Sequence, residues 1–229
     1  MTLLEAIESR HSVRRYKDIP LTKETVKILL QKIEEINRKG ELHIQLIMNE
    51  PKAFKGIFAY GRFSGVNNYF VVSGKKADDL DERAGYYGEQ LVLLAQQLGL
   101  NTCWVGQSYR KIENTFKLDD GEKIVCYIAV GYGETQGAEH KHKTLEDVSN
   151  INRLTPEWFK KGVTAALLAP TAVNQQKFYF EYVLSDEENQ KSKVKAKKLF
   201  SLVGYTNVDL GIAKCHFEIA AGTENFVWA

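Results

Sequence analysis

The chain has 229 residues, of which 44% are hydrophobic and 26% charged, so it is long enough for one well-buried domain. Its 31 basic and 29 acidic residues leave a formal net charge of +2, too weak a field to attract nucleic acid or an anionic membrane. No apolar run approaches the roughly 20 residues of a membrane-spanning helix, and no signal peptide is recognised. The three widely spaced cysteines form neither a disulfide framework nor a metal motif. We therefore expect a soluble, cytoplasmic protein that binds neither nucleic acid nor membranes.

The first part of the chain alternates helix and strand signals. Thr2 and Glu5 have capping-box spacing and predict a helix that ends near Ser9. Thr22 caps a second helix, which Gly40 ends. The other elements expected here are a strand over 42–48, a loop over 51–68, strands over 69–73 and 124–130, a strand or turn over 103–105, and a helix over 77–98.

A second series of elements follows the polar connector at 139–143. Thr155 and Pro156 are typical of a helix start, with Thr155 as the cap and Pro156 at the first helical position. Pro170 cannot continue this helix, which should end near Ala169. The remaining expected elements are a strand over 178–182, a solvated lysine-rich face or loop over 191–198 in preference to a polyanion site, and a helix over 207–221.

These two series resemble each other. The segment 64–68 leads into a strand and then a helix that contains Gly85, and the segment 171–175 leads into a strand and then a helix that contains Gly211. Internal duplication and chance both explain this shared order. With duplication, a site could lie between the two copies. The expected organisation is one domain over 1–229, with two related halves at 1–150 and 151–229.

Arg10, His11, Ser12 and Arg14 form the densest cluster of anion-binding groups in the sequence. Alternate residues of an extended segment share a face, so Arg10, Ser12 and Arg14 can point the same way. Two guanidinium groups and a hydroxyl on one side suit a phosphate group. The same pentapeptide could equally be a basic surface patch, and both interpretations stay open on these residues alone.

A second polar cluster begins where the helix before Pro170 ends. Pro170 fixes the backbone and exposes nearby amides, and Thr171 is a small hydrogen-bond donor. Asn174 and Gln176 carry amides that both donate and accept, as needed to pair with the edge of a heterocycle. On its own this segment could also be no more than a turn.

Together the two clusters resemble the flavin-binding motifs of the nitroreductase family of FMN-dependent oxidoreductases. The Arg-His-Ser-x-Arg opening at 10–14 and the Ala-Pro-Thr-x-x-Asn-x-Gln loop at 169–176 carry the resemblance. The Gly-Leu-x-x-Cys-Trp segment at 99–106, the strand and turn at 129–133, and the basic stretch at 141–146 add to it. The resemblance implies an α+β fold, in which a mainly antiparallel sheet is flanked by helices.

The resemblance also implies roles for individual residues. Arg10, His11 and Ser12 are expected to contact the FMN phosphate and ribityl chain. Arg14 is expected to reach the pyrimidine edge of the ring near N1 and O2. The other expected cofactor contacts are Lys141 and Lys143 for the phosphate, Asn174 and Gln176 for ribityl and ring atoms, the Val105 and Gly106 amides for flavin N5, and Pro170 and Thr171 in the same loop.

The position of this loop departs from the usual family pattern, in which it comes early in the chain. Here the early position is held by 63–69, which lacks the proline and the glutamine. The order resembles a branch of the family whose chain carries a second half-copy. Either Asn67 or Asn174 could face the flavin, and we favour Asn174 because its motif is more complete.

The function that the resemblance implies is an enzyme that passes electrons from NADH or NADPH, through FMN, to a nitroaromatic, quinone or similar electrophile. The flavin would carry the redox chemistry, so no catalytic side chain is expected. One alternative is a flavin-binding protein without efficient turnover, such as a sensor or a dehalogenating relative. Another is a non-catalytic protein whose basic pentapeptide binds acidic partners. Family members are usually dimers, and a homodimer stays open.

No metal site is expected from the histidines. His140 and His142 are two residues apart on a predicted loop, which is not metal-ligand spacing on a helix. Cys103 beside Trp104 predicts core packing rather than a reactive thiol. Four aromatic residues either cover a planar ligand or belong to the core: Phe54, Phe58, Tyr60 and Phe63.

Overall fold

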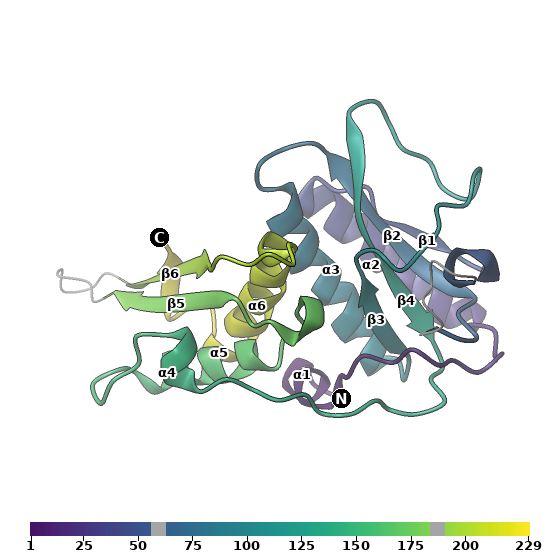
Figure 1. Cartoon of the computed structure of the whole chain (residues 1–229). Coiled ribbons are helices and arrows are strands. Elements are labelled where there is room, and N and C mark those ends of the chain that lie inside the picture. The colour runs from purple at the N-terminus through teal and green to yellow at the C-terminus, as the bar shows by residue number, and fades with distance from the viewer. Residues whose placement is uncertain (56–62, 184–190) are drawn as a thin grey trace.

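Two β-sheets enclose the central helices α3 (Leu80–Gln97) and α6 (Thr206–Ala221) in the computed structural model, which describes residues 1–55, 63–183 and 191–229 (Figure 1). Helix α3 packs on one sheet, α6 packs on the other, and the two helices pack on each other. The expected α+β fold with mainly antiparallel strands and flanking helices is confirmed, except that the strands form two sheets instead of one.

The first sheet has the strand order β1-β2-β4-β3, and every neighbouring pair is antiparallel. Its strands are β1 (Gln45–Ile47), β2 (Asn68–Lys75), β3 (Asn101–Val105) and β4 (Glu122–Gly131). The two central strands, β2 and β4, are apolar over most of their length because helices α2 (Lys23–Gly40) and α3 cover one face. The aromatic residues Phe54, Tyr69 and Tyr127 fill the other face.

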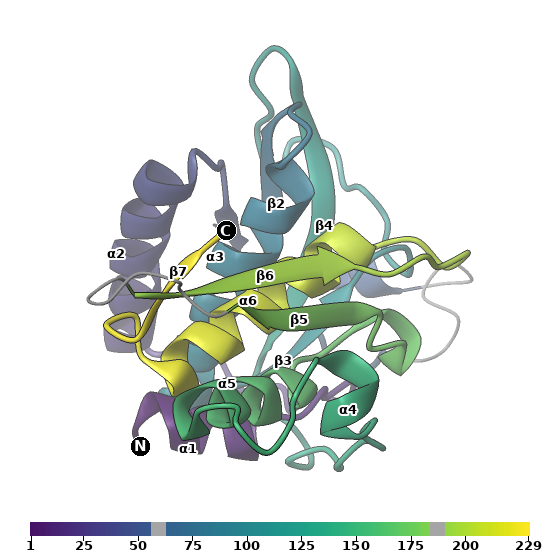
Figure 2. The same ribbon diagram turned by 90° about the vertical axis from the view of Figure 1, so that its left-hand side faces the viewer.

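The second sheet has the order β5-β6-β7, with β5 and β6 antiparallel and β6 and β7 parallel (Figure 2). It lies over α5 and α6, and its Phe180 and Phe226 pack on Phe217 of α6. Helix α4 (Leu145–Val148) packs against α5 and β5. The elements that accompany α6 in the second half are α5 (Glu157–Leu167), the 3-10 turn η3 (Ala172–Asn174), β5 (Phe178–Val183), β6 (Ser192–Lys198) and β7 (Phe226–Trp228).

The predicted helix starts are confirmed at α1 (Leu3–Ser9) and α2, where Thr2 and Thr22 accept hydrogen bonds from Glu5 N and Thr25 N. The cap expected for α5 is wrong. Pro156 is the cap residue, and the Thr155 hydroxyl instead accepts a hydrogen bond from Asn152 N at 2.9 Å. That bond closes a turn before the helix, and α5 begins at Glu157, one residue later than expected.

The lysine-rich stretch forms strand β6, so the expectation of a loop is wrong there while that of a solvated face holds. Its lysines are exposed and alternate with the buried Val194, which gives the strand one inner face. The strand expected over 42–48 is also shorter than the alternation indicated. Among the described residues, no helix combines the length and the apolar character that crossing a membrane requires.

Helices α3 and α6 cross where each carries a glycine. A Cβ atom on Gly85 would overlap the carbonyl oxygen of Val208, and a Cβ atom on Gly211 would overlap that of Glu82. The helix backbones can approach this closely only because both glycines lack a side chain. The crossing fixes the second half of the chain against the end of β3, where the site described next is found.

Candidate functional site

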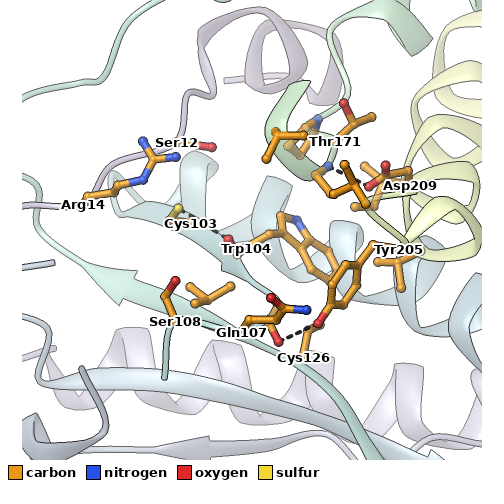
Figure 3. Close-up of a pocket in the computed structure, with 18 of the residues that line it drawn as sticks. Ser12, Arg14, Cys103, Trp104, Gln107, Ser108, Cys126, Thr171, Tyr205 and Asp209 are labelled. Carbon is orange, nitrogen blue, oxygen red and sulfur yellow. Dashed lines mark hydrogen bonds between the residues drawn. The ribbon is translucent and has the colours of Figure 1, made fainter. Parts of the chain in front are cut away.

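The segments 10–14 and 170–174, far apart in the sequence, lie on two sides of one cavity of about 290 Å³. Figure 3 shows Ser12 and Arg14 on one side, Thr171 and Asp209 on the other, and Trp104 between them. A neighbouring hollow of about 310 Å³ shares residues of both segments and extends to Arg10, His11 and Asn174. The two polar clusters singled out in the sequence therefore converge in space.

The segment 10–14 reaches the cavity because it runs alongside the edge strand β3. Ser12 forms a parallel bridge with Thr102, and Val13 N donates to Thr102 O at 3.0 Å. This extended backbone buries Val13 and leaves Ser12 and Arg14 at the cavity. The exposed Arg14 side chain forms no hydrogen bond or ion pair with the described residues, so its guanidinium is available to a ligand.

Arg10 differs from Arg14 in being buried, with 3% of its surface exposed. Its Nη2 donates to Leu168 O at 3.2 Å, at the end of α5, and its Nε lies 3.8 Å from Glu89 Oε1. Burial lowers the pKa of the Arg10 guanidinium, and the charge of Glu89 acts against that change. Arg10 thus joins the N-terminal segment to α3 and to the end of α5 at the border of the smaller hollow.

The loop after Pro170 has an unusual backbone. Val173, Asn174 and Gln176 have positive φ angles of 48°, 57° and 45°. This left-handed conformation is uncommon for residues other than glycine and least favourable for a β-branched residue such as Val173. Strain of this kind persists only where surrounding contacts hold it, and it is concentrated at functional sites.

Asp209 of α6 is one of the contacts that hold this loop. Its Oδ1 accepts a hydrogen bond from Ala172 N at 2.9 Å, and its Oδ2 accepts one from Gln175 Nε2 at 2.6 Å. Burial raises the pKa of Asp209 to about 6, although the hydrogen bonds from Ala172 and Gln175 lower it. Asp209 also lines the cavity, so a carboxyl group with a near-neutral pKa borders the site.

Asn174 and Gln176 use their amides mainly to bind the segment 141–143. Gln176 Nε2 donates to Lys141 O at 2.7 Å, and Gln176 Oε1 accepts from Lys143 N at 2.9 Å. Asn174 Nδ2 also donates to Lys141 O, at 2.9 Å, and Lys143 Nζ donates to Gln176 O at 2.7 Å. Burial lowers the pKa of the Lys143 ammonium group. Asn174 lines the smaller hollow, whereas the other three line neither that hollow nor the main cavity, and the flavin contacts expected of all four stay predictions.

The alternative residue Asn67 lies away from both hollows. Its Nδ2 donates to Asp18 Oδ1 at 2.8 Å near the surface. Phe63 does line the cavity and packs against Phe54, with ring centroids 5.2 Å apart, whereas Phe54 is in the core. Phe58 and Tyr60 lie outside the described residues. The segment 63–69 also lies beside Arg14, since Ser64 N donates to Arg14 O at 3.0 Å, but it is Asn174 and not Asn67 that lines a hollow together with Arg14.

Val105 and Gly106, at the end of β3, form the cavity wall together with Tyr205. The Tyr205 hydroxyl donates to Gly106 O at 2.7 Å, and Tyr205 itself has a positive φ of 59° at the start of α6. Cys103 is buried as expected, and burial raises the pKa of its thiol, although one side of it borders the cavity. Sequence reasoning missed Tyr205 and Asp209, which have no local motif.

Two histidines near the site, His140 and His142, lie within hydrogen-bond distance of a backbone carbonyl. His140 Nε2 and His142 Nδ1 lie 3.2 Å and 3.1 Å from Leu167 O, at the end of α5. Elsewhere, His43, Asp119 and Glu122 lie close together, and His43 Nδ1 is within hydrogen-bond distance of Glu122 Oε2, at 2.8 Å. None of these three residues lines the cavity.

The fold is shared with solved nitroreductase-like proteins. A protein described as a putative nitroreductase from Thermotoga maritima is 22% identical, with a TM-score of 0.66 over 96% of this chain and 83% of that one. One described as a putative nitroreductase in complex with FMN, from Desulfovibrio desulfuricans, is 20% identical, with a TM-score of 0.53 over 68% of this chain and 99% of that one. A third, also in complex with FMN, from Exiguobacterium sibiricum, is 17% identical, with a TM-score of 0.51 over 64% and 95%.

These likenesses define the class of fold, that of the nitroreductases. The model of the family described as "Putative TM nitroreductase" matches residues 2–221, and the chain therefore belongs to that family. No curated protein matches the chain.

Proposed function

We propose that the chain binds FMN in the cavity and passes electrons from NADH or NADPH to a nitroaromatic, quinone or similar electrophile. The observation that carries this proposal is the convergence of two segments on one cavity: Arg14, which has no partner among the described residues, and the strained Pro170–Val173 loop. Membership of a nitroreductase family supports a flavin oxidoreductase, and the solved relatives from D. desulfuricans and E. sibiricum contain FMN.

The residues present fit a flavin in both polarity and shape. Arg10 borders the smaller hollow, and its Nε is a buried donor without a hydrogen-bond partner among the described residues. Such atoms destabilise a fold unless a ligand or water pairs with them. The main cavity has apolar walls, from Trp104, Val203 and Ile212, that suit a flat aromatic ring.

In this arrangement the chain binds and orients, while FMN, when bound, would supply the redox chemistry. Arg14 would hold the pyrimidine edge, and its fixed positive charge would stabilise negative charge that develops nearby. Arg10, His11 and Ser12 would hold the phosphate side, where the smaller hollow lies. The Val105 and Gly106 backbone would face N5, and Pro170, Thr171 and Asn174 would complete the ribityl side.

The proposed site takes groups from both halves of the chain. Ser12, Arg14 and Trp104 come from 1–150, and Thr171 and Asp209 come from 151–229. A single chain therefore carries all of these groups, and a homodimer is not needed to bring them together. We propose on this ground that residues 1–229 form one domain of two related halves.

The test begins with the purified protein and its visible absorption spectrum. A yellow protein with flavin bands, or a colourless protein that takes up added FMN, supports the proposal. NADH or NADPH oxidation with nitroaromatic and quinone acceptors then separates an enzyme from a flavin-binding protein without turnover. A chain that is colourless and does not take up FMN would contradict the proposal.

A further inference from the structure

A buried charged cluster lies beside the cavity, where α3 and α6 pack together. Its centre is Glu89 of α3, whose side chain is fully buried. One carboxylate oxygen, Oε2, accepts a hydrogen bond from Trp104 Nε1 at 2.8 Å. The other, Oε1, lies 2.9 Å from His216 Nε2 and 3.8 Å from Arg10 Nε. A buried carboxylate is costly unless it is paired in this way.

Two partners of Glu89 belong to the proposed flavin site, on different sides of it. Trp104 lines the main cavity, and its indole ring lies against Gly88, where a Cβ atom would come within 2.6 Å of the ring. Arg10 borders the smaller hollow. Glu89 does not line either hollow, so it acts on a ligand through these two side chains and not by contact.

The third partner, His216 of α6, fixes the carboxylate itself. It is fully buried, and its Nδ1 lies 3.1 Å from Ala165 O in α5. Both ring nitrogens therefore face oxygen atoms, so the imidazole links the end of α5 to Glu89 and cannot rotate freely.

The buried carboxylate is found on α3, and the equivalent position of α6 carries a different residue. Glu89 comes four residues after Gly85 in α3, and the residue four after Gly211 in α6 is Cys215. Cys215 is buried and apolar in character, and burial raises the pKa of its thiol. The two helices thus differ at equivalent positions, and the carboxylate is found on the helix whose neighbours are Arg10 and Trp104.

We propose that Glu89 is a positioning residue of the flavin site, which holds the Trp104 wall and the Arg10 guanidinium together and is itself oriented by His216. This inference rests on the proposed function, because it assigns Arg10 to the phosphate side of FMN. Loss of the charge on Glu89 should therefore weaken binding of the phosphate more than binding of the ring.

Glu89→Gln tests the charge while preserving the shape of the side chain. The amide oxygen can still accept from Trp104, but Arg10 loses its anionic neighbour. The FMN dissociation constant should rise more than tenfold, while that of riboflavin, which lacks the phosphate, should change less than threefold. The matched control is Glu82→Gln on the same helix, which removes an ion pair to Lys214 of α6 (2.6 Å) outside the cavity. It should leave both constants within twofold.

His216 provides a second test that keeps Glu89 in place. His216→Asn puts an amide nitrogen near the position of Nδ1, keeps the bond to Ala165 O and loses the one to Glu89. His216→Gln puts it near Nε2 and keeps the bond to Glu89. FMN binding should weaken more than fivefold in the Asn variant and stay within twofold of the parent in the Gln variant.

The outcomes separate this role from the proposed function. If the parent chain does not bind FMN, the proposed function fails, and this role fails with it. If the parent binds FMN and Glu89→Gln binds it as tightly, or loses riboflavin equally, the positioning role alone is wrong. Should Glu89→Gln not fold, equal FMN affinity of the two His216 variants would overturn the role.

Discussion

Gly85 and Gly211 approach the opposite helix in a reciprocal way. A Cβ on Gly85 would meet the backbone of Val208 and Ile212, which are three residues before and one residue after Gly211. A Cβ on Gly211 would meet Glu82 and Tyr86, which are three before and one after Gly85. Contacts of this i-to-j and j-to-i kind are typical of a two-fold axis between identical subunits. Here they occur within one chain.

Alanine at either glycine should separate the two helices. Gly85→Ala and Gly211→Ala should each lower the free energy of unfolding by about 1–3 kcal/mol, because a methyl group overlaps backbone and cannot move aside. The higher helix propensity of alanine would by itself raise the free energy of unfolding. A net decrease can therefore be attributed to the overlap between the helices. In the double variant, the first methyl group already separates the helices before the second is added. The loss in free energy of unfolding should therefore be smaller than the sum of the two single losses. Urea unfolding measures all three, and strictly additive losses would argue against a shared crossing.

Asp209 should make stability depend on pH. Its folded pKa is raised by burial to about 6 from an ordinary value of 3.8, so the folded chain binds more protons than the unfolded chain between these values. Stability should therefore fall as pH rises from about 4 to about 6, by on the order of 2–3 kcal/mol relative to Asp209→Asn, which does not titrate. Unfolding of both proteins at pH 4 and pH 7 measures this, and a constant difference between them would refute it.

Arg14 should affect FMN binding and not folding. Its side chain is exposed and forms no bond to the described part of the chain, so Arg14→Ala should leave the melting temperature nearly unchanged. The lost charge-assisted hydrogen bond, typically about 1.5–3 kcal/mol, should weaken FMN binding about 10- to 150-fold. Lys17→Ala, on the same exposed segment, is the control and should bind FMN normally. Unchanged affinity in Arg14→Ala would favour a basic surface patch.

Gln176 should matter for stability, because its amide binds the backbone of 141–143. Gln176→Ala leaves Lys143 N without its acceptor and Lys141 O with one donor fewer. An unsatisfied buried group costs about 1–3 kcal/mol, so the free energy of unfolding should fall by about that amount. Thermal unfolding measured without FMN gives the answer. A variant that melts like the parent but loses FMN would instead restore the direct flavin contact expected from the sequence.

The sequence was informative where a signal is local. Thr2 with Glu5, and Thr22, predicted the starts of α1 and α2 because a cap is made within one turn of the chain. The sequence did not predict the short strand β7, since its partner strand β6 is separated from it in the sequence by the whole of α6. The lysine-rich composition of β6 did not predict a strand. Its pairing with β5 determines the structure of this segment more than its composition does.

The same distinction holds for the site. Motifs predicted a site at 10–14 and 170–174, and both segments line the same cavity, while their contacts with a flavin stay predictions. Asp209, Tyr205 and the pair Glu89 and His216 were not found, because each acts through a partner that is remote in sequence. Gln176 has the motif expected of a ligand contact, yet its bonds go to a neighbouring segment that periodicity could not place.

The stoichiometry of FMN binding tests the composite site most directly. Titration of the purified chain with FMN, followed by flavin fluorescence, should saturate at one FMN per chain, and light scattering on the same sample should give the mass of the complex. A site built from both halves predicts that ratio even for a monomer. Saturation at one FMN per two chains, or no saturable binding, would contradict it.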